Sequence, residues 1–180
     1  TGCPPLHQSS NMTKPPKAAS ARKPQVPSHP PHVISFVRAH EADARRVAAR
    51  TGVPTEVILA QSALESSWGR AVRGNAYFGV KGKSPSGSAT QFLTHEVTLS
   101  GQRVKQVDEF RAYASYSEAA DDYASLIQRR YAAAMVHRTE PERFAEAVAR
   151  QGYATDPQYA GKLKSIIRRH VSPLLTTVNP

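Results

Sequence analysis

Apolar residues recur every three or four positions along most of the chain after residue 32, and this spacing predicts amphipathic α-helices. Five helices are expected. They lie between residues 33 and 52, 54 and 69, 115 and 131, 139 and 152, and 156 and 170. The pattern therefore predicts a mostly helical domain.

Residues with known preferences for helix ends support these boundaries. Gly52 and Gly152 follow the last apolar positions of their helices, where a C-terminal glycine is common. Ser115 and Thr139 each precede a glutamate by three residues, which is the spacing of an N-terminal capping box. Asp156 stands directly before a proline, an arrangement suited to the N-cap and first position of the last helix.

One segment alternates apolar and polar residues in the manner of a β-hairpin. Its strands are expected over Thr90–Leu99 and Arg103–Ala112, joined by a two-residue turn at Ser100-Gly101. This turn would place Glu96 opposite Lys105, where the two side chains could form a cross-strand ion pair.

The two faces of the first strand differ in polarity. Leu93, Val97 and Leu99 lie on one face, which should therefore pack on the helical core. The other face carries Glu96 and should border either a cleft or solvent. Five helices and one hairpin define an α+β fold, mostly α, in which a cleft is expected between the helical lobe and the small β-hairpin lobe.

The second predicted helix contains one carboxylate at an unusual position. Glu65 falls on the flank of an apolar stripe, where Gln61 is the only polar neighbour on the same side. Burial beside the stripe and proximity to the helix C-terminus should both raise the pKa of Glu65. A carboxylic acid that keeps its proton near neutral pH can act as a general acid. The alternative is a structural glutamate that is bonded to a neighbouring backbone group.

Composition separates a tail from the domain. Residues 1–32 contain eight prolines and four basic residues but no acidic residue, so we expect a flexible basic tether. The domain should span residues 33–172, and residues 173–180 should form a C-terminal tail.

Of the net charge of +10, the domain and C-terminal tail keep +6, which suggests an anionic partner. No nucleic-acid-binding motif is present, so a cell-wall polymer is favoured over nucleic acid.

Cysteine and histidine usage argues against a metal site. The single cysteine excludes an intramolecular disulfide and a cysteine-based metal cluster, and no metal or cofactor is expected.

Thr1-Gly2-Cys3 is similar to the end of a bacterial lipoprotein signal, in which the cysteine carries a lipid. Association with a membrane is expected only through such a lipid, and an ordinary cysteine is the alternative. No apolar run is long enough to cross a membrane.

Four separated motifs carry a family resemblance. They are Ala60–Gly69, Asn75–Lys81, Phe110–Tyr116 and Gly152–Tyr159. In this order they resemble the peptidoglycan-cleaving glucosaminidases of glycoside hydrolase family 73, which include the muralytic domain of the flagellar rod-assembly protein. The resemblance covers residues 33 to 171 and implies a lysozyme-like fold.

The resemblance also implies roles for residues within these motifs. Glu65 corresponds to the catalytic glutamate, and Tyr153 resembles the active-site tyrosine of the family. Further motif residues are candidates for contact with the glycan. These are Gln61, Trp68, Asn75, Tyr77, Phe78, Tyr113, Tyr116 and Asp156. Core packing is the alternative for Tyr77, Phe78 and Tyr153, and helix capping is the alternative for Asp156.

A second active-site carboxylate is expected on the hairpin. Glu96 resembles the family's residue at this position and is preferred, and Asp108 and Glu109 on the returning strand are the competing candidates. The second carboxylate would activate water or stabilise the charged transition state. A participating N-acetyl group of the substrate could replace it.

These features predict hydrolysis of β-1,4 bonds in the glycan strands of peptidoglycan. Cleavage after N-acetylglucosamine is expected, and cleavage after N-acetylmuramic acid or an inactive wall-binding or assembly module are the alternatives. The expected location is the periplasm or cell envelope, or outside the cell. An immunity or inhibitor protein and a flagellar or secretion-system component are the candidate protein partners.

Overall fold

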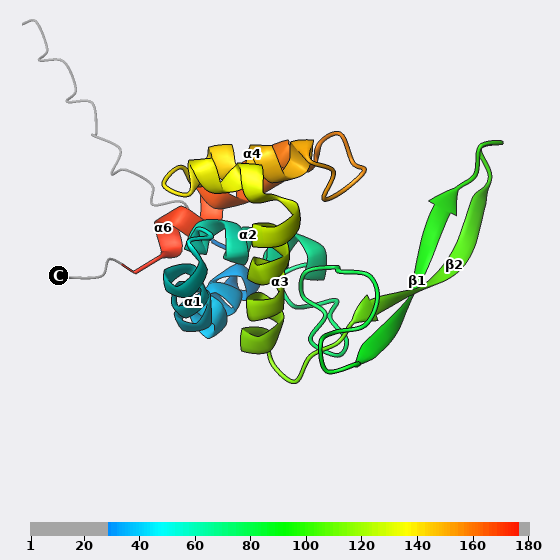
Figure 1. The fold of residues 1–180 in the computed structure, drawn as a ribbon, viewed down its shortest axis with the longest axis horizontal. Coiled ribbons are helices and arrows are strands. Elements are labelled where there is room, and N and C mark those ends of the chain that lie inside the picture. Colours follow the sequence, from blue (N-terminus) through cyan, green and yellow to red (C-terminus); the bar gives the residue numbers. More distant parts are fainter. Residues whose placement is uncertain (1–28, 177–180) are drawn as a thin grey trace, which may run out of the picture.

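The computed structural model describes residues 29–176, apart from the side chain of Glu96. The helices pack into one body and the two strands project from it as a hairpin (Figure 1). The helices are α1 (Pro31–Thr51), α2 (Thr55–Ser66), α3 (Tyr116–Arg130), the 3₁₀ helix η1 (Ala132–His137), α4 (Pro141–Arg150), α5 (Tyr159–Ile166), the π-helix η2 (Ile167–Val171) and α6 (Ser172–Leu174). The strands are β1 (Ala89–Val97) and β2 (Arg103–Arg111). The expected α+β class is confirmed.

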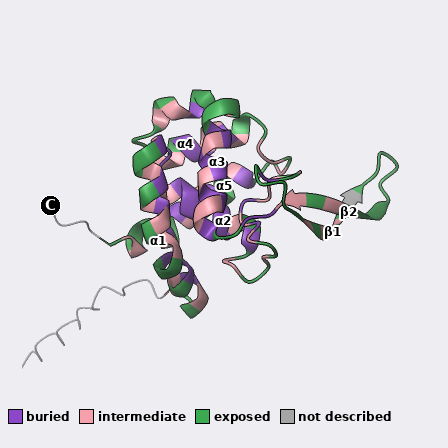
Figure 2. Cartoon of the chain, turned by 60° about the horizontal axis from the view of Figure 1, so that its bottom comes forward, coloured by how far each residue is buried: buried purple, intermediate pink, exposed green. Residues whose placement is uncertain are grey.

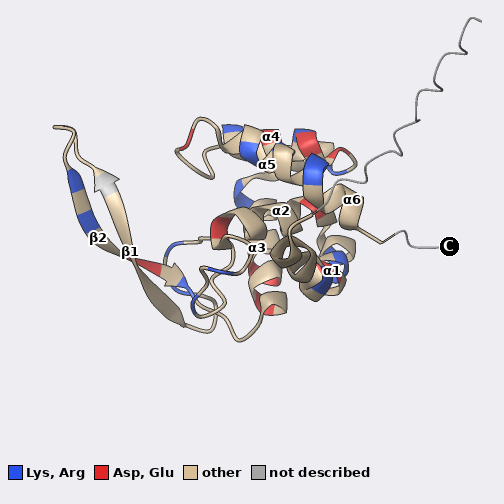
Figure 3. Ribbon diagram, turned by 180° about the vertical axis from the view of Figure 1, so that it is seen from behind, with Lys and Arg blue, Asp and Glu red and all other residues tan. Residues whose placement is uncertain are grey.

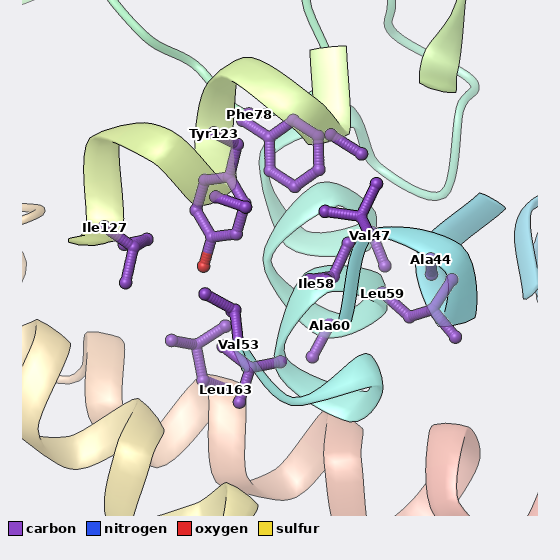
Figure 4. Close-up of a cluster of buried hydrophobic side chains, with 14 of the residues drawn as sticks. Ala44, Val47, Val53, Ile58, Leu59, Ala60, Phe78, Tyr123, Ile127 and Leu163 are labelled. Carbon is purple, nitrogen blue, oxygen red and sulfur yellow. The ribbon is translucent and has the colours of Figure 1, made fainter. Parts of the chain in front are cut away.

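Helix α2 forms the centre of the helical body. It contacts α1, α4, α5 and η2, and most of its residues are buried on every side. Ile58 and Leu59 are fully buried in the cluster shown in Figure 4, where Phe78 stacks on Tyr123. Figure 2 shows that buried residues concentrate on the facing sides of the helices, whereas the hairpin is largely exposed. A carboxylate on α2 is therefore held by a rigid, well-packed element.

Two predicted helix ends are confirmed. Gly52 has φ = 80°, and its N–H donates to the Ala48 carbonyl oxygen at 2.8 Å. The Ser115 hydroxyl caps α3 by accepting from the Glu118 N–H at 3.1 Å. Both contacts satisfy backbone groups that a helix leaves unpaired at its ends.

Helix α2 ends three residues earlier than the sequence predicted. It stops at Ser66 because Ser67, Trp68 and Gly69 all adopt left-handed conformations, with φ of 52°, 58° and 77°. Two consecutive non-glycine residues rarely do so, and the pattern offered no sign of it. Glu65 consequently lies next to the last residue of the helix.

The starts of α4 and α5 also differ from the prediction. Thr139 does not cap α4, whose N-cap position is occupied by Glu140 without a side-chain bond. Asp156 does not cap α5, which begins three residues later at Tyr159. The Asp156 Oδ1 atom instead accepts from the Gln158 N–H at 2.9 Å in a local turn, and this turn delays the helix.

The hairpin register differs from the prediction by one residue. The strands are joined by the five residues 98–102, within which the Thr98 N–H donates to the Gln102 carbonyl oxygen and the Gly101 N–H donates to the Thr98 carbonyl oxygen. The Thr98 hydroxyl adds to this loop by accepting from the Gln102 N–H. Glu96 therefore pairs with Val104, and the predicted pairing of Glu96 with Lys105 is wrong.

The prediction that the more apolar strand face packs on the core is also wrong. Leu93, Val97 and Val107 on that face are 60%, 69% and 60% exposed. The opposite face, with Phe92 and Phe110, is half-buried and turns toward the helical body. The reason is that the body supports the hairpin only at its base, so most of both strands extends beyond the core.

Hydrogen bonds and an ion pair fix the base of the hairpin. The Arg111 N–H donates to the Val80 carbonyl oxygen at 2.8 Å, and the Arg111 side chain pairs with Asp122 of α3 at 3.0 Å. Tyr113 also donates to the Asp122 carboxylate. Because this pair is mostly buried and Asp122 accepts from both Arg111 and Tyr113, it sets the position of the β lobe relative to α3.

Helix α1 begins at Pro31 and α6 ends at Leu174, so helical structure extends two residues beyond each end of the range 33–172 that the sequence analysis proposes for the domain. The tether prediction for residues 1–28 and the lipid prediction for Cys3 lie outside the described residues. No helix among residues 29–176 has the length and apolar character needed to cross a membrane.

Candidate active site

Glu65 lies in a cleft between the helical body and the hairpin. The cleft has a volume of about 280 Å³. It is lined by Glu65, Ala71, Ala76, Gly79, Phe92, Leu93, Thr94 and Phe110. The cleft expected between the two lobes is therefore present, and the carboxylate on its helical side belongs to α2.

The Glu65 carboxyl group is open to solvent on the cleft side and surrounded by protein elsewhere. This loss of hydration raises the pKa of Glu65, and a hydrogen bond from Tyr159 opposes the increase to a smaller extent. The increase predicted from the sequence is confirmed in direction. Its main cause is desolvation by the surrounding protein.

Two segments, the loop that contains Gly79 and helix α5, lie against the Glu65 carboxyl group. The Tyr159 hydroxyl of α5 donates to Glu65 Oε1 at 2.8 Å. Gly79 approaches so closely that a Cβ atom there would lie 2.8 Å from Glu65 Oε2. Gly79 also has φ = 62°, a conformation that favours glycine. The Gly79 loop and α5 therefore restrict where the carboxyl group can point.

The Tyr153 hydroxyl does not donate to Glu65. Its hydroxyl donates to the Phe78 carbonyl oxygen at 2.7 Å, one residue before Gly79, and its ring stacks against Tyr159 at 6.0 Å. Tyr153 thus anchors the loop that lies against the carboxyl group. The tyrosine that bonds Glu65 is Tyr159, which the sequence analysis placed in the last motif without assigning it a role.

Asp108 is the best-defined carboxylate on the hairpin. It accepts from the Thr94 hydroxyl at 2.6 Å and from Gln106 Nε2 at 2.9 Å, and Lys81 Nζ lies 3.7 Å away. These contacts, with the Thr94 bond contributing most, hold the pKa of Asp108 below its usual value. Asp108 is therefore ionised at neutral pH and is tied to Thr94, which lines the cleft.

The other two hairpin carboxylates are placed differently. The Glu96 side chain lies outside the described residues, and its backbone pairs with Val104 farther from the hairpin base. Glu109 pairs with Gln91 and is exposed on the strand face opposite to that of Asp108. Along β2, Arg103 and Lys105 lie toward the tip, Asp108 and Glu109 nearer the base, and Arg111 at the base itself (Figure 3). Asp108 is the described carboxylate on the strand face that carries Phe92, Thr94 and Phe110, which are three of the four hairpin residues lining the cleft.

Four predicted glycan contacts are buried, which does not agree with direct contact to a sugar. Gln61, Phe78, Tyr116 and Tyr113 are 0%, 1%, 5% and 7% exposed. Gln61 bonds the Tyr159 hydroxyl, Tyr116 bonds Ser62, and Tyr113 bonds Asp122. These residues form the framework behind the cleft.

The four remaining predicted contacts lie outside the cleft lining. Trp68 is half-buried with its ring edge-on to Phe36, and Tyr77 is half-buried in the same aromatic cluster, where burial raises its pKa. Asn75 donates to the Tyr113 carbonyl oxygen. Asp156 pairs with Lys162 at 2.6 Å, which helps to keep its pKa low.

The residues that the sequence analysis missed are Gly79, Phe92, Thr94, Phe110 and Tyr159. Phe92, Thr94 and Phe110 share one strand face. Alternation along the strands could have identified this face as the cleft wall, but the sequence analysis took the opposite, more apolar face to be the inner one. Among residues 29–176, no group of three or more His, Cys, Asp or Glu side chains could hold a metal ion.

Comparison with known proteins places this cleft in a family context. Residues 41–171 match the Glucosaminidase family model, described as mannosyl-glycoprotein endo-beta-N-acetylglucosaminidase. The peptidoglycan hydrolase FlgJ of Salmonella typhimurium is 43% identical over 136 residues, which are 70% of this chain and 42% of that protein. The exo-glucosaminidase LytG of Bacillus subtilis is 34% identical over 134 residues, which are 69% of this chain and 46% of that protein. The chain thus spans less than half the length of these curated relatives.

Solved structures share the fold. A peptidoglycan hydrolase mutant from Sphingomonas sp. A1 is 38% identical with a TM-score of 0.65, covering 74% of this chain and 92% of that chain. A C-terminally truncated glycoside hydrolase domain of Salmonella typhimurium FlgJ is 38% identical with a TM-score of 0.60, covering 76% of this chain and 95% of that chain. These similarities agree with the lysozyme-like fold expected from the sequence.

Proposed function

The chain belongs to the glucosaminidase family, and on this basis we propose that it hydrolyses the glycan strands of bacterial peptidoglycan after N-acetylglucosamine. The observation that carries the proposal is Glu65, a carboxyl group with a raised pKa in the cleft between the lobes. Similar proteins named peptidoglycan hydrolase and exo-glucosaminidase support the substrate and the bond. They also support the cell envelope as the place of action.

In this mechanism Glu65 is the general acid. Its proton passes to the glycosidic oxygen as the bond from that oxygen to the anomeric carbon breaks, and the sugar develops oxocarbenium character. Because Glu65 Oε1 already accepts from Tyr159, the transferable proton belongs on Oε2. The Tyr159 bond then stabilises the carboxylate that remains after proton transfer.

For the second carboxylate we favour Asp108 over Glu96, the residue preferred from the sequence. Asp108 is ionised and fixed by Thr94 at the edge of the cleft, so its negative charge can stabilise the oxocarbenium ion without reorganisation. Water completes the reaction by adding to the anomeric carbon, and the proton that it releases replaces the one that Glu65 gave up. The half-buried rings of Phe92 and Phe110, which line the cleft, offer apolar surface to the sugar.

Analysis of reaction products tests the proposal. Purified peptidoglycan is digested with the enzyme and reduced with borohydride, and the fragments are then identified by mass spectrometry. Glucosaminitol ends are expected because cleavage after N-acetylglucosamine creates a new reducing end on that sugar. Muramitol ends would instead identify a muramidase, and the absence of fragments would identify a binding or assembly module.

A further inference from the structure

Gln61 lies one helical turn before Glu65 on α2 and is completely buried. Its Nε2 atom donates to the Tyr159 hydroxyl oxygen at 3.1 Å. Tyr159, which is also buried, donates in turn to Glu65 Oε1 at 2.8 Å. Gln61, Tyr159 and Glu65 therefore form a continuous chain of two hydrogen bonds that begins in the core and ends in the cleft.

The orientation of the Gln61 amide determines the direction of this chain. A tyrosine hydroxyl has one hydrogen atom, and it can donate that hydrogen to one acceptor at a time. With the Gln61 N–H directed at the Tyr159 oxygen, the hydroxyl hydrogen is available to Glu65. If the amide were reversed, Gln61 Oε1 would compete for this hydrogen and the carboxyl group would lose its donor.

The observed orientation has a structural cost. Gln61 Oε1 is buried and has no hydrogen-bond partner among the described residues. Buried polar atoms without partners are uncommon because they lose hydration without compensation. Packing alone would favour an apolar residue of similar shape at this position, so the amide contributes something other than stability.

We propose that Gln61 is a positioning residue for the hydrolysis, fixing the Tyr159 hydroxyl as a donor to Glu65 and thereby assisting proton release from Glu65. This inference rests on the proposed function of Glu65. When Glu65 transfers its proton, the new carboxylate strengthens the bond from Tyr159. Donation by Gln61 polarises the tyrosine hydroxyl further, since successive hydrogen bonds in a buried chain reinforce each other.

The ionisation of Glu65 can be followed separately from that of the neighbouring titratable groups. The titratable groups that face it among the described residues are the phenols of Tyr159, Tyr153 and Tyr123, from α5, the preceding loop and α3. Burial raises the pKa of all three phenols. They therefore stay neutral over the working pH range, and the alkaline limb of the pH profile reports Glu65.

The test compares kcat/KM against pH for Gln61→Met, Tyr159→Phe and the double variant on soluble peptidoglycan fragments. Tyr159→Phe should lower the maximal kcat/KM about tenfold or more, because the Glu65 carboxylate loses the hydrogen bond that stabilises it. The same loss should raise the pKa of Glu65 and so move the alkaline limb of the profile to higher pH. Gln61→Met should change both quantities in the same direction but less, with a fall of about threefold in the maximal kcat/KM. The double variant should match Tyr159→Phe, since Gln61 acts only through Tyr159.

Tyr123→Phe is the matched control. It removes a buried hydroxyl that has no partner among the described residues, within the same core. Its maximal kcat/KM and alkaline limb should equal those of the wild type, and Gln61→Met should melt at the wild-type temperature or above. An unchanged alkaline limb in Gln61→Met, or additive effects in the double variant, would overturn the inference. Wild-type turnover in Glu65→Gln would overturn the proposed function itself.

Discussion

Replacing Gly79 with alanine tests how the carboxyl group of Glu65 is positioned. The new Cβ atom would lie 2.8 Å from Glu65 Oε2, whereas ordinary contacts begin at 3.4 Å. The carboxyl group must therefore move by about the difference, 0.6 Å, because the residues on either side of Gly79 are held by hydrogen bonds to their carbonyl oxygens. The nearby Tyr153 bond to the Phe78 carbonyl oxygen keeps the loop from retreating.

The effects on stability and activity should differ in size. Alanine in the left-handed conformation costs about 1–2 kcal/mol of folding free energy, which corresponds to roughly 2–8 °C in melting temperature for a domain of this size. Displacement of the Glu65 carboxyl group costs little folding free energy, because this group lies at the end of a flexible side chain. A misplacement approaching 1 Å costs up to about 100-fold in rate, so we expect kcat to fall at least about tenfold.

Gly87→Ala separates the two effects. Gly87 also has a left-handed conformation, with φ = 82°, but no atom lies within 4 Å of the position of its added Cβ. It should lose a similar amount of stability, measured by thermal melting, while kcat on soluble peptidoglycan fragments stays at the wild-type value. Equal kcat for the two variants would refute the idea that Gly79 is required by the approach of Glu65.

Two further predictions concern the hairpin and the tail. Asp108→Asn should lower kcat about 100-fold, whereas Glu96→Gln should lower it less than tenfold, and steady-state kinetics showing the reverse order would return the role of second carboxylate to Glu96. Deletion of residues 1–28, which are rich in proline and contain no acidic residue, should leave the melting temperature and the activity on soluble fragments unchanged. A drop of several degrees would show that this segment packs on the domain.

The central helix and its carboxylate could be predicted because their signals are local. Helix α2 is apolar on almost every side, and Glu65 in its last turn stands out against these residues. Gly52 ends α1 and Ser115 caps the start of α3, as predicted. Both could be predicted because a left-handed C-terminal residue and a hydroxyl cap each depend on only a few adjacent residues. The position of Glu65 in the cleft wall then followed from its place near the end of the helix.

The hairpin register could not be predicted from alternation alone. Alternation fixes which residues share a face, but the loop fixes which residues oppose each other. Backbone and hydroxyl bonds of Thr98 lengthened the loop and moved Glu96 away from Lys105. The exposed Leu93 face was equally unpredictable, because local polarity does not show that a strand extends beyond its core.

The role of Tyr159 depends on a contact between distant segments. Its hydroxyl meets Glu65 across 94 positions of sequence, and its place at the start of α5 depends on the turn that Asp156 forms. Tyr153, the more prominent candidate in the same motif, points to the Phe78 carbonyl oxygen instead. Gln61, which the sequence analysis proposed as a glycan contact, is instead buried and bonded to the Tyr159 hydroxyl.

The most direct test of the account is the turnover of Glu65→Gln on purified peptidoglycan, compared with Glu56→Gln on the first turn of the same helix. Glu65→Gln is nearly isosteric and removes the proton donor, so turnover should fall by about 100-fold to 10,000-fold while the melting temperature at neutral pH does not decrease. Glu56→Gln should retain wild-type turnover. Turnover of Glu65→Gln within tenfold of the wild type would contradict the assignment of Glu65 as the general acid.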